Sequence, residues 1–180
     1  MYAQQLELFD LFNPSSNKAR SHFTFVDLFA GIGGFRIPLE ELGCKCLGYS
    51  EIDKKAIQVY RDNFIKDANS DEVYLGDITN LSQFPFTIDL LVGGVPCQPW
   101  SIAGKMQGLD DPRGKLWTDV FRVVTANRPK AFIFENVKGL TEPRNIESLK
   151  YIINNLTSSG YVVKYEVLNS YDFGLPQDRD

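Results

Sequence analysis

The sequence predicts an α/β fold, with a mostly parallel sheet and helices on both of its faces. Apolar runs of strand length alternate with longer amphipathic segments along most of the 180 residues. Polar residues or glycines follow several of these runs, at Gly31–Gly34, Glu51, Asp77, Cys97 and Glu135. A βαβα alternation forms parallel sheets, and ligands bind such sheets beyond the carboxyl ends of the strands.

Each expected strand is a short run rich in apolar, β-branched and aromatic residues, which suits a sheet that is covered on both faces. In chain order the strands are Phe23–Leu28, Cys46–Ser50, Val73–Leu75, Ile88–Val92, Ala131–Phe134 and Tyr161–Leu168.

The expected helices lie between the strands, where the apolar residues recur at helical spacing and a glycine or proline follows. In chain order they are Gly33–Leu42, Lys54–Phe64, Lys115–Ala126 and Ile146–Ser159. Residues 1–22 read as an extension and linker, Ser101–Gly114 as a glycine-containing loop, and 23–180 as one domain.

Composition bounds the class of protein. Hydrophobic residues make up 43% and aromatic residues 13% of the chain, as in a globular domain. No run of about 18 apolar residues predicts a membrane span, and the first residues lack the pattern of a secretory signal, so we expect the cytoplasm. The three cysteines form no CxxC pair, which argues against a disulfide framework and a zinc site. A net charge of −4 argues against strong binding of a polyanion by this chain alone.

The turn Phe29–Gly34 and two carboxylates suggest a nucleoside site. Glycines let the backbone approach a ligand closely. Glu51 ends the second strand, about 20 residues after the turn, where a carboxylate can bind ribose hydroxyls. Asp77 follows the third strand, where a carboxylate can accept from an exocyclic amine. Alone, the turn could be structural and Glu51 a solvated charge.

Cys97 and Glu135 suggest a nucleophile and an acid. Cys97 stands in a Pro96-Cys97-Gln98 loop after a buried run and two glycines. Its alternative is a small buried hydrophobe, the usual role of a free cysteine. Glu135 ends an apolar strand, where partial burial would raise the pKa of its carboxyl and suit a general acid. Its alternative is a surface carboxylate. The single histidine, His22, lies in the extension, which argues against a Cys/His protease.

Five ordered motifs together resemble the DNA (cytosine-5)-methyltransferases. FAGIGG resembles the family's S-adenosylmethionine turn, GGVPCQPWS its nucleophile loop and ENV its acid motif, while DPRGKLW and YDFGLPQDR occupy the later positions. The resemblance covers Phe25 to the C-terminus. It implies a Rossmann-like, S-adenosylmethionine-dependent methyltransferase fold, and double-stranded DNA with a flipped cytosine as the substrate, as in restriction-modification systems.

The resemblance also implies roles for individual residues. Cys97 would attack C6 of cytosine, Glu135 would contact or protonate N3, and Asn136 would orient that region. Arg179 would be a further catalytic residue. The residues implied to contact the cofactor are Phe29, Ala30, Gly31, Ile32, Gly33, Gly34, Glu51, Ile52, Asp77, Ile78, Pro96 and Leu116. Those implied to contact the nucleic acid are Gln98, Ser101, Lys105 and Arg113.

One departure from the family concerns the C-terminus. The family's eighth motif is Q-x-R-x-R, and here Gln177-Asp178-Arg179-Asp180 stops before the second arginine. The target-recognition region and the last part of the cofactor pocket are expected to lie in a missing C-terminal part or a complementing subunit, so the chain alone should have little activity. Two alternatives stay open: an RNA (tRNA) cytosine methyltransferase, and an inactive remnant that binds a partner protein.

Overall fold

The computed structural model describes residues 23–65, 71–96 and 115–177. It contains one five-stranded parallel sheet in the order β3-β2-β1-β4-β5. The strands are β1 (Thr24–Leu28), β2 (Lys45–Ser50), β3 (Val73–Gly76), β4 (Leu90–Gly94) and β5 (Ala131–Glu135). The predicted fold class is therefore confirmed, and five of the six expected strands form within a few residues of their expected bounds.

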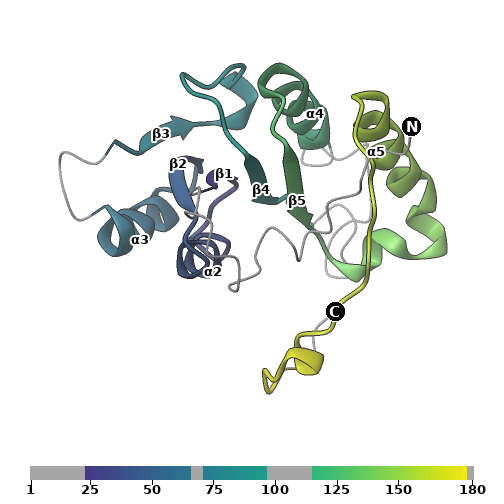
Figure 1. The fold of residues 1–180 in the computed structure, drawn as a ribbon. Coiled ribbons are helices and arrows are strands. Elements are labelled where there is room, and N and C mark those ends of the chain that lie inside the picture. The colour runs from purple at the N-terminus through teal and green to yellow at the C-terminus, as the bar shows by residue number, and fades with distance from the viewer. Residues whose placement is uncertain (1–22, 66–70, 97–114, 178–180) are drawn as a thin grey trace, which may run out of the picture.

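Helices cover both faces of this sheet (Figure 1). The α-helices are α2 (Arg36–Glu41), α3 (Lys54–Phe64), α4 (Leu116–Asn127) and α5 (Ile146–Ser158). Short 3₁₀ turns are η1 (Ile78–Asn80), η3 (Lys138–Thr141), η4 (Pro143–Asn145) and η5 (Ser170–Phe173). The helix α2 begins later than the expected Gly33, because the glycine turn extends through residue 35.

The strand alternation divides the core between the two faces. Val26 and Leu28 of β1 pack with residues of α4 and α5 in the larger cluster. Phe25, one position away, packs with Leu39 of α2 and with Val92 of β4 in a second cluster. Successive side chains of a strand point to opposite faces, so one short apolar run serves both cores.

Local signals explain where α3 begins and where α4 ends. The side chain of Asp53 accepts hydrogen bonds from the backbone N–H groups of Lys55 (2.8 Å) and Ala56 (2.9 Å), which caps the start of α3. Arg128 ends α4 in the left-handed conformation (φ 48°), and Pro129 follows it. The Arg128 side chain donates to the backbone oxygen of Ser159 and lies over the Tyr161 ring, which ties the end of α4 to the end of α5.

The expected strand Tyr161–Leu168 is wrong, because the structure has no strand there. Its first residues do pack: the Tyr161 hydroxyl donates to the Pro129 oxygen (2.7 Å), and Tyr161 and Val163 join the larger core cluster. A strand needs a neighbour to satisfy its backbone groups, and among the described residues β5 pairs with β4 alone. Tyr161 and Val163 therefore pack on the core, but among the described residues no strand pairs with this segment.

A buried carboxyl lies within β1. Asp27 is 1% exposed, and neither of its side-chain oxygens has a hydrogen-bond partner in the structure. Burial raises the pKa of Asp27 to about 8; Arg36 opposes this shift, and Glu51 and Glu72 add to it. The fold therefore favours the protonated form of this side chain.

We predict that Asp27 makes the fold less stable as the pH rises. Its pKa is near 3.9 in an unfolded chain and about 8 in the fold. Its stabilising contribution is complete below about pH 4 and is lost as the pH rises towards 8. In urea unfolding at a series of pH values, Asp27→Asn should gain stability relative to wild type across this window.

Asp89→Asn is the matched control, because its pH dependence has the opposite sign. Burial opposes the shift, but hydrogen bonds from Lys130 and Thr24 outweigh burial and lower the pKa of Asp89. Its contribution is therefore lost as the pH falls. If wild type and Asp27→Asn kept a constant stability difference from pH 4 to 8, the assignment of a raised pKa to Asp27 would be wrong.

Candidate active site

The turn after β1 takes a backbone conformation that side chains rarely allow. Phe29 (φ 55°), Gly31 (φ 55°) and Gly33 (φ 97°) all have positive φ. The Ala30 N–H donates to the Ser50 oxygen (3.0 Å) and the Gly33 N–H to the Ala30 oxygen (2.8 Å). The turn is therefore fixed against the end of β2, and a non-glycine residue, Phe29, holds strained backbone within it.

The glycines of this turn serve different purposes. A Cβ added to Gly33 would lie 2.3 Å from Cε2 of Phe64 in α3, so close packing as well as φ requires glycine there. A Cβ on Gly34 would meet nothing within 4 Å. The turn thus packs against α3 on one part of its backbone and faces open space on another.

Glu51 links the turn to the start of α3. One carboxylate oxygen accepts from the Gly31 N–H (2.8 Å), and the other accepts from the N–H groups of Ile52 (2.7 Å) and Asp53 (2.8 Å). Tyr74 of β3 donates its hydroxyl to the Glu51 backbone oxygen (2.9 Å). Glu51 is therefore more than a solvated charge, because it bonds to the turn directly.

Asp77 and the exposed isoleucines lie beyond the ends of neighbouring strands. One oxygen of Asp77 accepts from the Thr79 N–H (2.9 Å) and caps η1. The Ile78 side chain is buried at 3% exposure, whereas Ile32 and Ile52 are 63% and 69% exposed. These two apolar side chains, on either side of Glu51 in the sequence, are left uncovered.

The ends of β4 and β5 lie side by side. Gly94 pairs with Glu135 in the parallel register. A Cβ on Gly94 would lie 3.3 Å from Oε2 of Glu135, so glycine leaves room for that carboxylate. Glu135 is exposed, which corrects the expectation of partial burial: β5 ends at the edge of the sheet, where the neighbouring apolar residues do not cover the last side chain.

Asn136 joins the chain after β5 to the chain after β4. Its side-chain N–H donates to the Val95 oxygen (3.1 Å), and its own oxygen accepts from the Val137 N–H (3.0 Å). Pro96, partly buried, is the last described residue of that segment. The predicted orienting role of Asn136 thus has a specific contact in the structure.

The remaining predicted residues lie against the core or outside the described residues. Leu116 is the first residue of α4 and packs against the larger core cluster. The predicted residues outside the described ranges are Cys97, Gln98, Ser101, Lys105, Arg113 and Arg179.

Two features next to the turn were not predicted from the sequence. One is the buried Asp27, which reads as an ordinary strand residue in an apolar run. The other is a buried ion pair between Arg36 and Glu72 (2.6 Å). The spacing of Arg36 and Glu40 signals a helical ion pair, but no local pattern links Arg36 to a carboxylate 36 residues away.

The described residues lack a metal-binding cluster and a membrane-spanning helix. They contain no group of three or more His, Cys, Asp or Glu side chains that could hold a metal ion. They also contain no helix that is long and apolar enough to cross a membrane.

Comparison with known proteins gives consistent relatives. The chain is 60% identical over 158 residues to the type II methyltransferase M.HgiCII of Herpetosiphon aurantiacus, covering 88% of this chain and 36% of the relative. It is 44% identical over 178 residues to M.HpaII of Haemophilus parainfluenzae, covering 96% of this chain and 48% of the relative. The chain thus spans between about a third and a half of these relatives.

A solved structure and a family model agree with these relatives. The structure, described as a DNA modification methyltransferase encoded within a prophage of E. coli, has a TM-score of 0.65 and 26% identity over 87% of this chain and 44% of that one. The family model for C-5 cytosine-specific DNA methylase matches residues 23–180. The chain that folds into this sheet, with its glycine turn and its Glu135 edge, therefore belongs to the C-5 cytosine-specific DNA methylase family.

Proposed function

We propose that this chain provides the catalytic and cofactor-binding part of a type II methyltransferase that methylates C5 of cytosine in double-stranded DNA. The observation that carries the proposal is the edge formed by β4 and β5. There Gly94 leaves room for the Glu135 carboxylate, and Asn136 holds Val95, two residues before Cys97. A nucleophile that follows Pro96 and an acid on the neighbouring strand suit covalent attack on a base.

The residues around the turn fit S-adenosylmethionine. Uncovered apolar side chains at Ile32 and Ile52 suit the faces of an adenosine, and the open backbone at Gly34 suits the methionine part. Glu51 retains acceptor capacity for ribose hydroxyls on the oxygen that takes a single N–H. Asp77 and the Ile78 backbone would take the adenine edge, with Pro96 and Leu116 nearby. When bound, S-adenosylmethionine supplies an activated methyl group.

The chain's own residues would then act on the flipped base. The Cys97 thiolate forms a bond to C6, and Glu135 protonates N3, so the electron pair released by this attack makes C5 nucleophilic. C5 would then take the methyl group, leaving S-adenosylhomocysteine. The C5 proton would pass to water, the Cys97 thiolate would leave C6, and N3 would return its proton to Glu135, which restores the aromatic ring. Asn136 would hold Val95, which precedes the nucleophile loop, throughout.

The other cysteines support this choice of nucleophile. Cys44 and Cys46 are buried at 7% and 5% exposure. Burial raises the pKa of both thiols, that of Cys46 to about 12, so neither supplies thiolate at neutral pH.

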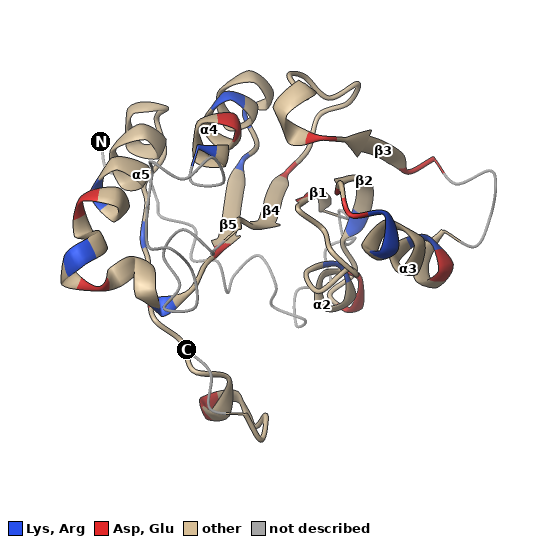
Figure 2. Ribbon diagram, turned by 180° about the vertical axis from the view of Figure 1, so that it is seen from behind, with Lys and Arg blue, Asp and Glu red and all other residues tan. Residues whose placement is uncertain are grey.

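We also propose that turnover on DNA needs a further region, which the relatives carry outside the matched part. Lys and Arg of the described residues lie on several elements with Asp and Glu among them, instead of gathering on one face (Figure 2). Because nonspecific DNA binding depends on Lys and Arg contacts to phosphates, this surface offers little of it. A cytoplasmic location, at the bacterial nucleoid, follows from the proposed substrate.

The 180-residue chain should show little or no methylation of double-stranded DNA on its own. Mixing it with the C-terminal part of M.HgiCII should restore transfer of labelled methyl groups from S-adenosylmethionine. Rapid, sequence-specific methylation by the chain alone would contradict the need for a further region. Labelling of tRNA in place of DNA would favour the RNA alternative, and labelling of neither would favour the remnant.

Glu51→Ala should weaken binding of S-adenosylhomocysteine by about tenfold or more, because it removes both the ribose acceptor and the bond to the turn. Calorimetry on the 180-residue chain measures this. Glu41→Ala is the matched control, since Glu41 is exposed on α2. Equal affinity of wild type and Glu51→Ala would show that the cofactor site lies elsewhere.

Cys97→Ser should abolish covalent trapping by DNA that carries 5-fluorocytosine. Fluorine does not leave C5 as a proton does, so the complemented wild-type enzyme should accumulate a stable adduct. A serine hydroxyl is far less ionised than a thiol and is a poor nucleophile. Cys44→Ser, the same substitution at a buried thiol, should still form the adduct. An adduct that maps to Cys44 or Cys46 would overturn the assignment.

A further inference from the structure

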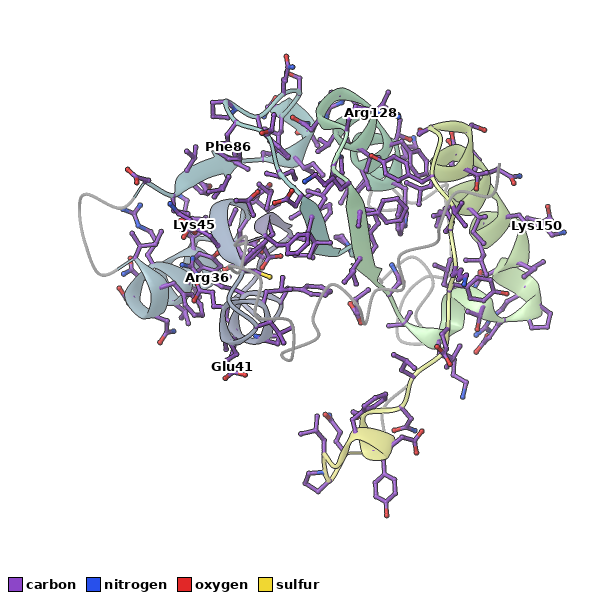
Figure 3. The ribbon with its side chains drawn as sticks, viewed as in Figure 1. Arg36, Glu41, Lys45, Phe86, Arg128 and Lys150 are labelled. Atoms are coloured by element: carbon purple, nitrogen blue, oxygen red, sulfur yellow. The ribbon has the colours of Figure 1, made fainter. Side chains whose placement is uncertain are left out.

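A nearly buried cation directly follows the glycine turn in the chain. Arg36 begins α2, and its side chain is 7% exposed. Its guanidinium bonds to Glu72 (2.6 Å), the Tyr60 hydroxyl (3.0 Å) and the half-exposed Glu40 (2.9 Å). Figure 3 shows Arg36 between α2 and α3. Its donors are thus satisfied by side chains from three separate parts of the chain.

The buried ion pair of Arg36 adds little net free energy of folding, because removing both charges from water is unfavourable. The side chain of Glu72 is 5% exposed, so both members of the ion pair are removed from water. Desolvation offsets much of the attraction in such a pair, and an apolar replacement of similar volume often stabilises a fold equally well. A buried pair does, however, fix the relative geometry of the groups that it joins.

The ion pair reaches the turn through an aromatic ring. The Arg36 guanidinium carbon lies 4.6 Å from the centre of the Phe64 ring. The same ring occupies the space beside Gly33, with Cε2 2.3 Å from the place of an added Cβ. Glu72 is therefore linked to the turn through Arg36 and Phe64.

We propose that Glu72 is a positioning residue that holds the turn Phe29–Gly34 in its cofactor-binding shape through Arg36 and Phe64. Glu51 fixes the Gly31 end of the turn and Phe64 fixes the Gly33 end. Losing the Glu72 charge leaves Arg36 free to reorient towards Glu40, and the Phe64 ring then loses its support. The effect on the shape of the turn does not depend on the proposed function. The effect on affinity for the cofactor does rest on it.

The first experiment measures the turn itself in the 180-residue chain without any ligand. Hydrogen exchange should be about tenfold faster at the Gly31 and Gly33 amides in Glu72→Gln than in wild type, with no change at Leu91 in β4. Glu40→Gln is the matched control, because solvent can replace a carboxylate that is 41% exposed. Unchanged exchange at both glycines in Glu72→Gln would overturn the proposal.

The second experiment measures affinity for S-adenosylhomocysteine by calorimetry. Glu72→Gln and Phe64→Leu should each weaken binding about tenfold, and Glu40→Gln less than about threefold. The double variant Glu72→Gln/Phe64→Leu should bind no worse than either single variant, because both changes break the same chain of contacts. Additive losses would show that the two residues act independently, as purely structural roles predict.

The two experiments separate the two hypotheses. If wild type binds no S-adenosylhomocysteine, the proposed cofactor site fails, while amide exchange still decides whether Glu72 holds the turn. If Glu72→Gln does not fold, Phe64→Leu carries both measurements, with faster exchange at Gly33 expected and an unchanged rate contradicting the proposal.

Discussion

The parallel register of β1, β4 and β5 is the constraint on which the site depends. It aligns Leu28 with Gly93 and Gly94 with Glu135, so that three chain segments leave the sheet at one edge. The small residues matter here, since a Cβ on Gly93 would come within 2.8 Å of the Leu28 oxygen. Substituents at either glycine would push the strands or the carboxylate apart, and the edge would lose its shape.

The strained turn needs support from outside its own sequence. Positive φ at Phe29 is unfavourable for a residue with a Cβ, and such backbone persists only where surrounding contacts fix it. Glu51 accepts one hydrogen bond from the turn, at the Gly31 N–H, and Phe64 packs against it at Gly33. Both supports come from the β2–α3 unit, so the shape of the glycine turn depends on the position of that unit. The unpartnered Asp27 just before the turn adds a second local conflict at the same place.

Local signals in the sequence were enough to predict most of the fold. The spacing of apolar residues predicted α3 with the bounds Lys54–Phe64 that the structure has, and the glycines predicted the turn. What failed depended on partners distant in the chain. The Arg36–Glu72 pair has no periodic signature, and the exposure of Glu135 depends on which side chains reach the end of β5. Periodicity reports which residues are apolar, but it does not report what they pack against.

The segment after α5 shows the same limit. Tyr161 and Val163 pack on the core, yet Tyr165 and Val167, which would share their face in an extended chain, are 60% and 43% exposed. Tyr171 and Phe173 of η5 and Leu175 after it are exposed as well, and the yellow segment that carries them leads away from the sheet (Figure 1). Exposed apolar residues in a continuous run are typical of surfaces that pack against another protein segment, and their own pattern does not say which segment that is.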